Sequence, residues 1–329
     1  MVIKSNKGRK RKFIFFILLV IVAFVAIRWL KGCSLEKDEV WDDSLSQSTI
    51  DEITYNGHQY RYNNNLINIL YLGVDNYDII RNDRMPGEAG QTDCIMILSL
   101  DRETKKAKII QIPRDTMTEI DIYNRSGEVT DTVVEQIATQ YAYCTGGTNS
   151  CWAAKKTISE MLYDLPIDAY LAMDMASIAM VNDAVGGVTL TIPKDYTMID
   201  SEFKEGVTLT LKGDQAYDYV HWRDTNTSFS NNDRMERQVQ YIPAMIDTVR
   251  ANAELEGNYY DVIYPLVEKY MITDLQENEI NELAKYELSV SDIQRLPGEG
   301  KKGEVYEEFY LDDEKLQEIL IETFYILKK

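Results

Sequence analysis

Four charged residues stand at the ends of three apolar runs in the first half of the chain. Asp75 follows the first run, Asp93 precedes the second, and Arg114 and Asp115 follow the third. Each run has the length of a β-strand, so each charged side chain falls where a strand meets a loop. Carboxylates supply the hard oxygen ligands that Mg²⁺ prefers, and a planar guanidinium matches two phosphoryl oxygens. The three runs are residues 67–74, 94–100 and 108–112.

The connection between the second and third runs decides how these residues meet. Residues 101–106 form a polar segment of hairpin length, which predicts antiparallel pairing. That pairing places Asp93 beside Arg114. If the first run joins the same sheet, Asp75 completes a rim suited to a metal ion and a phosphate. The alternative is that Asp and Arg only close strands, as they commonly do.

Two further arginines, Arg234 and Arg237, lie three residues apart at the predicted start of a long helix. Residues at this spacing share one helical face. Arginines are unusual in a first helical turn, because the helix dipole there favours anions. The first backbone N–H groups of a helix are free to bind an anion, so two arginines beside them indicate phosphate binding. Pairing with nearby acids such as Asp233 or Glu236 is the alternative.

Strand and helix patterns alternate through the rest of the chain. This alternation predicts one α/β domain, a three-layer α/β/α arrangement around a central mixed sheet. Residues 76–91 form a loop at the predicted rim that carries Arg81 and Arg84, and residues 116–130 are polar with turn signals. The predicted strands also include residues 55–62, 167–173, 188–192, 206–211 and 305–311, and the predicted helices are residues 131–143, 151–163, 177–185, 213–221, 232–253, 259–273, 278–286 and 313–327.

The first 30 residues predict a membrane anchor. Residues 1–12 hold six basic residues and no acid, and residues 13–27 contain no polar side chain. Because basic residues stay in the cytoplasm, we expect a cytoplasmic tail (1–12), a transmembrane helix (13–30), a linker (31–54) and an extracellular domain (55–329). A cleavable signal peptide is the alternative, but the residues after the apolar run make a poor cleavage site.

Acidic residues dominate the predicted extracellular part. The chain has 54 acidic and 35 basic residues, a net charge of −19, and the first 33 residues contain no acid. Such a domain repels nucleic acid and anionic lipid surfaces, so nucleic-acid binding is excluded. Any bound anion must be held by a local group of arginines.

The four cysteines have different expected roles. Cys144 and Cys151 flank a flexible loop, and an extracellular location would allow them to form a disulfide. Zinc binding is the weaker alternative, because no histidine or third cysteine lies nearby. Cys94 is expected to be a buried thiol. Cys33 only weakly matches a lipidation site, because Lys31 precedes it.

The chain lacks the motifs of several enzyme classes. It has two histidines, no G-x-S-x-G elbow, no P-loop and no glycine-rich nucleotide motif. An extracellular enzyme also has little access to ATP. We therefore expect phosphoryl chemistry on a substrate that carries its own activated phosphate.

Six short motifs follow one another between residues 68 and 246. They are LGVD (72–75), TDCIM (92–96), IPRD (112–115), VGGV (185–188), LKGDQA (211–216) and RMERQ (234–238). This series, behind a predicted anchor, resembles the LytR-CpsA-Psr family of cell-wall glycopolymer ligases. The resemblance implies an apolar pocket for a polyprenyl chain. It also implies transfer of a lipid-pyrophosphate-linked glycopolymer, such as teichoic acid or capsule, to peptidoglycan, with Mg²⁺ or Mn²⁺ at the pyrophosphate.

The resemblance also implies roles for individual residues. Asp75 and Asp93 match the metal-site acids, and Asp233 is expected to accept the proton of the attacking hydroxyl, with Asp115 as second candidate. The expected catalytic arginines are Arg114, Arg223, Arg234 and Arg237, and the expected pyrophosphate-binding residues are Arg81, Arg84, Arg114, His221 and Arg223.

Three positions depart from the family pattern. His221 stands where the first arginine of an R-x-R pair is expected, and Gln91 where an arginine often precedes the T-D pair. The aspartate that the family has before the R-x-x-R-Q motif is either replaced by Asn231 or shifted to Asp233. Two other functions stay open: a hydrolase of polyprenyl pyrophosphates, and an anchored, non-catalytic sensor that binds a polyprenyl lipid. The missing arginine at position 221 is the only sequence feature that favours the sensor.

Overall fold

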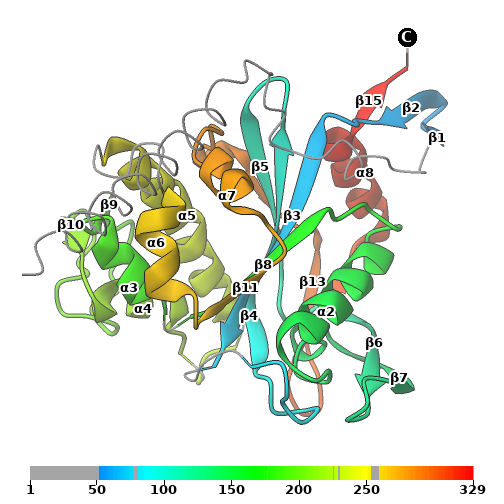
Figure 1. The fold of residues 1–329 in the computed structure, drawn as a ribbon, viewed down its shortest axis with the longest axis horizontal. Coiled ribbons are helices and arrows are strands. Elements are labelled where there is room, and N and C mark those ends of the chain that lie inside the picture. The colour runs from blue at the N-terminus through cyan, green and yellow to red at the C-terminus, as the bar shows by residue number, and fades with distance from the viewer. Residues whose placement is uncertain are drawn as a thin grey trace, which may run out of the picture. The chain divides into compact units, whose positions relative to one another are not determined.

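The computed structural model describes residues 52–328 except 77–80, 176, 225, 229 and 253–258 (Figure 1). The predicted tail and anchor, Cys33 and most of the predicted linker lie outside the described residues. No helix within the described ranges combines the length and the apolar composition needed to cross a bilayer.

A six-stranded mixed sheet forms the centre of the fold, in the order β11-β8-β3-β4-β5-β12. Strands β4 and β5 pair antiparallel, as the polar turn at 101–106 predicted, and β3 also pairs antiparallel with β4. Strand β8 lies parallel to β3, and β12 lies parallel to β5. The strands are β3 (Leu66–Asp75), β4 (Gln91–Asp101), β5 (Lys106–Ile112), β8 (Ala169–Asp174), β11 (Met271–Thr273) and β12 (Ile293–Arg295).

Helices lie on both faces of the central sheet (Figure 1). Leu70 and Leu72 pack in a core with α2 (Gly147–Met161) and α8 (Asp313–Phe324). Ile69 and Tyr71 instead line a cavity with residues of α3 (Ser177–Ala184) and α5 (Asn231–Ala251). Helices therefore cover both faces of the sheet, and the predicted α/β fold with a central mixed sheet is confirmed.

Smaller elements surround this sheet. Strands β9 (Val188–Thr191) and β10 (Thr208–Leu211) form a hairpin arm that shares a second core with α4 (Asp214–His221) and α5. The remaining elements are β1 (Glu52–Tyr55), β2 (His58–Tyr62), β6 (Met117–Tyr123), β7 (Val129–Gln136), η2 (Ile137–Thr139), α6 (Tyr259–Val267), α7 (Glu277–Leu283), η4 (Val290–Asp292), β13 (Gly298–Lys302), β14 (Glu307–Leu311) and β15 (Tyr325–Leu327).

The predicted helix at 131–143 is wrong. Residues 129–136 form β7, which pairs antiparallel with β6 in a hairpin closed by the turn at Asn124 and Gly127. The β-branched residues Thr132, Val133 and Val134 favour a strand, and most of β7 is exposed. The apolar residues that occurred at helical spacing are therefore not one buried stripe.

Two other predicted helices end earlier than expected. Helix α6 ends at Val267, and Met271–Thr273 pairs with β8 as an edge strand. Helix α8 ends at Phe324, and Tyr325–Leu327 pairs with β2. Pairing with a distant strand decides the conformation in both cases, which local periodicity does not report.

The predicted disulfide is also wrong, because Cys144 and Cys151 are buried free thiols. Helix α2 begins at Gly147 rather than at Cys151, and Ser150 fixes this start by accepting from the backbone N–H of Gly146. Cys151 therefore lies on the buried face of α2 and packs into the core. Cys94 is a buried free thiol, as predicted.

Candidate active site

Asp93 lies at the centre of a group of charged side chains at one edge of the sheet. One oxygen accepts a hydrogen bond from Arg114, which follows β5, and Oδ2 accepts from Nη1 of Arg234 on α5 at 2.5 Å. Arg234 is 1% exposed. Strand pairing brings the first two residues together, and the docking of α5 on the sheet adds the third.

The charge state of Asp93 follows from these contacts. Burial alone would raise the pKa of this carboxyl, but Arg234 and Arg114 outweigh burial and hold the pKa below its usual range. Asp93 is therefore ionised, and it compensates two buried guanidinium groups.

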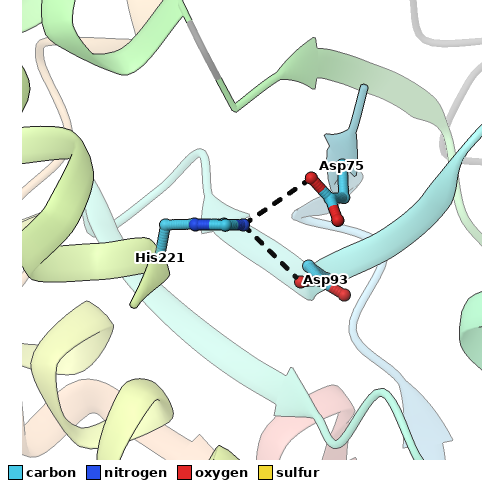
Figure 2. A group of neighbouring side chains, drawn as sticks. All are labelled: Asp75, Asp93 and His221. Carbon is cyan, nitrogen blue, oxygen red and sulfur yellow. Dashed lines mark ion pairs between the residues drawn. The ribbon is translucent and has the colours of Figure 1, made fainter. Parts of the chain in front are cut away.

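Asp75 and His221 lie beside Asp93 (Figure 2). Nε2 of His221 lies 3.6 Å from Oδ1 of Asp75 and 4.0 Å from Oδ2 of Asp93. The His221 ring, at the end of α4, stacks on Tyr217 at 4.6 Å between centroids. One ligand atom from each of the three residues lies within 4.8 Å of the others, so the donor set fits a divalent cation. Two carboxylates suit Mg²⁺, and the imidazole extends the fit to Mn²⁺.

The strand ends that carry these residues have an irregular register. A shift between Gly73 and Val74 sets Asp75 opposite Gln91. A Cβ at Gly73 would lie 2.9 Å from the Cβ of Cys94, so β3 and β4 approach closely only because this residue is glycine. The side-chain oxygen of Gln91 then accepts from Arg114. Gln91 therefore orients Arg114 instead of adding a positive charge.

Asp115 lies next to this group, on the other side of Arg114 in the chain. Its carboxylate accepts hydrogen bonds from Gln136 at 3.1 Å and Asn231 at 3.2 Å, and lies 3.5 Å from Nε of Arg114. Burial raises the pKa of Asp115 although Arg114, Arg223 and Arg234 oppose the shift. A raised pKa makes a carboxylate a better proton acceptor at neutral pH.

The structure does not bring Asp233 to this group. Asp233 is 55% exposed and binds Nζ of Lys194 at 2.7 Å. Both residues lie at the surface, where Glu236 also binds Lys194. Asp115, the second candidate in the sequence, is the carboxylate that the fold places at the site.

Arg237 has a structural contact that the sequence did not indicate. Its Nε donates to the carbonyl oxygen of Tyr219 at 2.5 Å, another nitrogen donates to the carbonyl of Trp222, and the guanidinium lies over Tyr196 at 5.0 Å. These carbonyls belong to the end of α4, which carries His221 and leads to Arg223. Arg237 thus positions those residues, while Arg234 contacts Asp93.

The remaining predicted arginines divide into two groups. Arg223 is half-buried beside Asp115, and burial followed by the nearby Arg234 and Arg114 lowers its pKa. Arg81 and Arg84 lie against Gly146 at the start of α2, and Arg84 lines a separate hollow there. The fold therefore brings Arg223 to the site but not Arg81 or Arg84.

An apolar cavity of about 260 Å³ adjoins the charged group. Its lining includes Cys94, Val220 and Gln238, which are sequence neighbours of Asp93, His221 and Arg237. The rest is almost entirely apolar, with Tyr71 and Met96 from the sheet and other residues from α3 and α5. Such a cavity fits a hydrocarbon chain whose polar end lies at Asp93.

Sequence reasoning missed several residues of the site. Gln136 was assigned to a helix, and Arg295 ends a three-residue strand that is too short to detect. Arg295 lies near Asp115 because β12 runs parallel to β5 and the two strands end at the same edge.

The fold and the site define an α/β protein with a charged, metal-competent rim beside an apolar cavity. The chain belongs to the LytR_cpsA_psr family, whose model matches residues 35–323.

Named relatives agree with this assignment, and solved structures have a similar fold. A polyisoprenyl-teichoic acid–peptidoglycan teichoic acid transferase TagU of Bacillus cereus is 30% identical over 241 residues, covering 72% of this chain and 70% of the relative. TagU of Halalkalibacterium halodurans is 28% identical over 249 residues, covering 74% and 72%. The fold is similar to B. subtilis TagV, with a TM-score of 0.59 at 24% identity, covering 78% and 96%. It is also similar to TagT bound to LI-WTA, with a TM-score of 0.57 at 22% identity, covering 79% and 89%.

Proposed function

We propose that this protein transfers a glycopolymer of the teichoic acid class from a polyisoprenyl-linked donor to peptidoglycan. The named relatives support the reaction class, since they are polyisoprenyl-teichoic acid–peptidoglycan teichoic acid transferases. The carrying observation is the position of the Asp93–Arg114–Arg234 group beside an apolar cavity on one side and Asp115 on the other.

The donor would bind in two parts. Its hydrocarbon chain would occupy the cavity between the sheet and α5, where burial of each CH₂ contributes about 0.8 kcal/mol. Its pyrophosphate would lie at the rim, where Arg114 and Arg223 attract phosphoryl oxygens in a protein that is otherwise acidic. Buried Arg234, bound to Asp93 and Asn231, would add positive charge behind them. These arginines would stabilise charge that develops on the transferred group and on the leaving lipid phosphate.

Asp75, Asp93 and His221 would hold a divalent cation, Mg²⁺ or Mn²⁺. Such an ion supplies charge neutralisation at a pyrophosphate. The protein's own contribution is to orient the two carboxylates. The close approach of β3 and β4 at Gly73 determines the position of Asp75. Arg114 and Arg234 each bind one carboxylate oxygen of Asp93 and so fix its orientation.

Asp115 would accept the proton of the attacking sugar hydroxyl. Gln136 and Asn231 hold its carboxylate in place, and its raised pKa favours proton uptake in the transition state. Arg237 would act indirectly, since it fixes the end of α4 through two carbonyl groups.

We further propose that residues 13–30 anchor the protein in the cell membrane, with the amino terminus in the cytoplasm and the domain outside. The support is the basic segment 1–12 followed by the apolar run 13–27. A membrane-anchored domain would meet a lipid-linked donor at the bilayer surface.

One experiment tests the transfer reaction. The full-length chain is incubated in detergent with Mg²⁺ or Mn²⁺, a synthetic lipid-pyrophosphate-linked sugar and peptidoglycan fragments, and the products are weighed by mass spectrometry. Wild-type protein should form the sugar-phosphate conjugate of the fragment, and Arg114→Ala should not, while its circular dichroism stays that of a folded domain. Phosphate release without conjugate would instead identify a hydrolase, and donor binding without turnover would identify a lipid-binding sensor.

A further inference from the structure

Two hollows lie on either side of Asp115. The first, of about 410 Å³, is lined by Pro113, Asn231, Asn232, Arg295 and Phe309, among others. The second, of about 260 Å³, is lined by Arg223, Ser230 and Lys302 with neighbouring residues. Asp115 and Glu307 line both hollows, so the two meet at the proposed proton acceptor.

The first hollow and the apolar cavity lie at successive positions along helix α5. Asn231 and Asn232 in its first turn line the first hollow, and Gln238, Tyr241 and Met245 line the apolar cavity. Arg234 lies between these groups and binds Asp93. A molecule in the first hollow would therefore approach the charged group from the side opposite to the lipid.

Arg295 is the one arginine in the lining of the first hollow. Its guanidinium lies over the ring of Phe309 at 5.2 Å, which holds it in a fixed orientation. Within the described part of the chain it forms no ion pair, and its Nε has no hydrogen-bond partner. Asp115 and Glu236 act electrostatically on its charge, but neither forms an ion pair with it. The half-buried guanidinium can therefore bind an anion in a chain of net charge −19.

The other lining groups restrict what this anion can be. Glu307 and Glu308 repel a polyanion such as a second polymer phosphate chain, while Asn231 and Asn232 suit hydroxyl and amide groups. The occupant should therefore be largely neutral and hydrogen-bonding, with one localised carboxylate. A glycan with carboxylated peptide substituents has this chemistry.

We propose that the first hollow is the binding site for the acceptor glycan and that Arg295 binds a carboxylate of its peptide substituent. This inference rests on the proposed transfer function and names the acceptor subsite for it. The reacting hydroxyl then lies at Asp115, and the arginines of the rim stay available to the donor.

The test measures binding separately from turnover. Two probes are titrated into the full-length chain in detergent by calorimetry: a disaccharide with a stem peptide that has free carboxylates, and the same fragment with amidated carboxylates. Wild-type protein should bind the free acid at least about tenfold more tightly, as expected for a charge-assisted hydrogen bond.

Variants decide whether Arg295 causes this difference. Arg295→Gln should remove the preference for the free acid, and Arg295→Lys, which keeps a point charge, should retain part of it. Lys301→Gln is the matched control, because Lys301 on β13 lies over Tyr310 of β14 and does not line the hollow. A full preference in Arg295→Gln, or an equal loss in Lys301→Gln, would overturn the proposal. Wild-type protein that binds the free acid but forms no conjugate would contradict the transfer function and leave the acceptor subsite standing.

Discussion

Nη1 of Arg234 donates to Oδ2 of Asp93 at 2.5 Å across 141 residues of sequence. The pair joins helix α5 to the central sheet, and Arg114 binds the other oxygen of the same carboxylate. One buried acid thus compensates two buried guanidinium groups.

Asp93→Asn should destabilise the domain as well as abolish transfer. The substitution removes the ion-pair partner of buried Arg234 and leaves Arg114 with only Asp115 among the described residues, which costs roughly 3–5 kcal/mol by the usual effect of breaking a buried pair. Thermal unfolding at pH 7.5 measures the loss. Asp233→Asn is the control, since this exposed carboxylate binds only at the surface and should change stability by less than about 1 kcal/mol. Loss of transfer in Asp233→Asn would restore Asp233 as the proton acceptor.

The same carboxyl predicts the direction of acid sensitivity. The pKa of Asp93 is lower in the folded protein, so its stabilising contribution is present above the unfolded pKa and is lost as pH falls through the folded pKa. Wild-type protein should therefore lose its stability advantage over Asp93→Asn in acid. Equal differences in melting temperature at pH 7 and pH 3, to within error, would contradict this explanation.

The contribution of Asp168 to stability should have the opposite pH dependence. Burial raises its pKa to about 6, so the folded state favours the protonated acid, and stability from this group declines as pH rises through that value. Asp168→Asn should raise the free energy of unfolding at pH 7.5 by on the order of 2 kcal/mol and much less at pH 4.5. Because the variant is compared with wild type at each pH, a gain of the same size at both values would be the contrary result.

His221 should increase affinity for Mn²⁺. Replacing it with arginine, the residue that the family motif favours here, removes an imidazole ligand and adds a charge that repels the cation. We expect Mn²⁺ affinity, measured by electron paramagnetic resonance, to fall about tenfold or more in His221→Arg. His58→Arg changes the chain's other histidine, on the exposed strand β2, and should leave Mn²⁺ affinity unaltered. Identical affinities in wild type and His221→Arg would remove His221 from the cation site.

Arg237→Lys tests whether Arg237 holds the end of α4 in place rather than contacting the substrate. Lysine keeps the positive charge but cannot bind the carbonyls of Tyr219 and Trp222 together, so the end of α4 should loosen. We expect kcat to fall and the amide exchange of α4 to rise, with roughly 1–3 kcal/mol of lost stability. Arg102→Lys is the matched control, because this half-buried arginine also donates to a backbone carbonyl, that of Asn64, but lies far from α4 in the chain. Lost kcat with unchanged exchange of α4 would instead assign Arg237 a direct role.

Local patterns were sufficient for part of the site. Asp75, Asp93 and Arg114 could be predicted because a hairpin and alternating apolar residues determine which strand ends meet. Arg234 and Arg237 share their spacing and helix, yet one binds Asp93 and the other binds backbone carbonyls. The difference depends on what each face of α5 packs against, which is tertiary information.

Asp115 and Asp233 show the same limit. Asp115 follows an arginine of one family motif, and Asp233 precedes an arginine of another. The docking of α5 on the sheet decides that Asn231, and not Asp233, reaches the site. The hairpin β6–β7 was missed because apolar residues at helical spacing outweighed its β-branched composition. Arg295 came from a strand of three residues, for which no periodic signal exists.

The hydrogen bonds from Arg237 to the end of α4 join α4 to α5, so the two helices would move together. His221 and Arg234 are carried by the α4–α5 pair, while Asp75, Asp93 and Arg114 are carried by the sheet, and the cavity lies between these two bodies. Any outward rocking of α5 that admits a bulky hydrocarbon must also pull Arg234 from Asp93 and His221 from Asp75. Under the proposed function, entry of the lipid and separation of the charged side chains would therefore occur together, and the charged group would re-form once the hydrocarbon chain is bound.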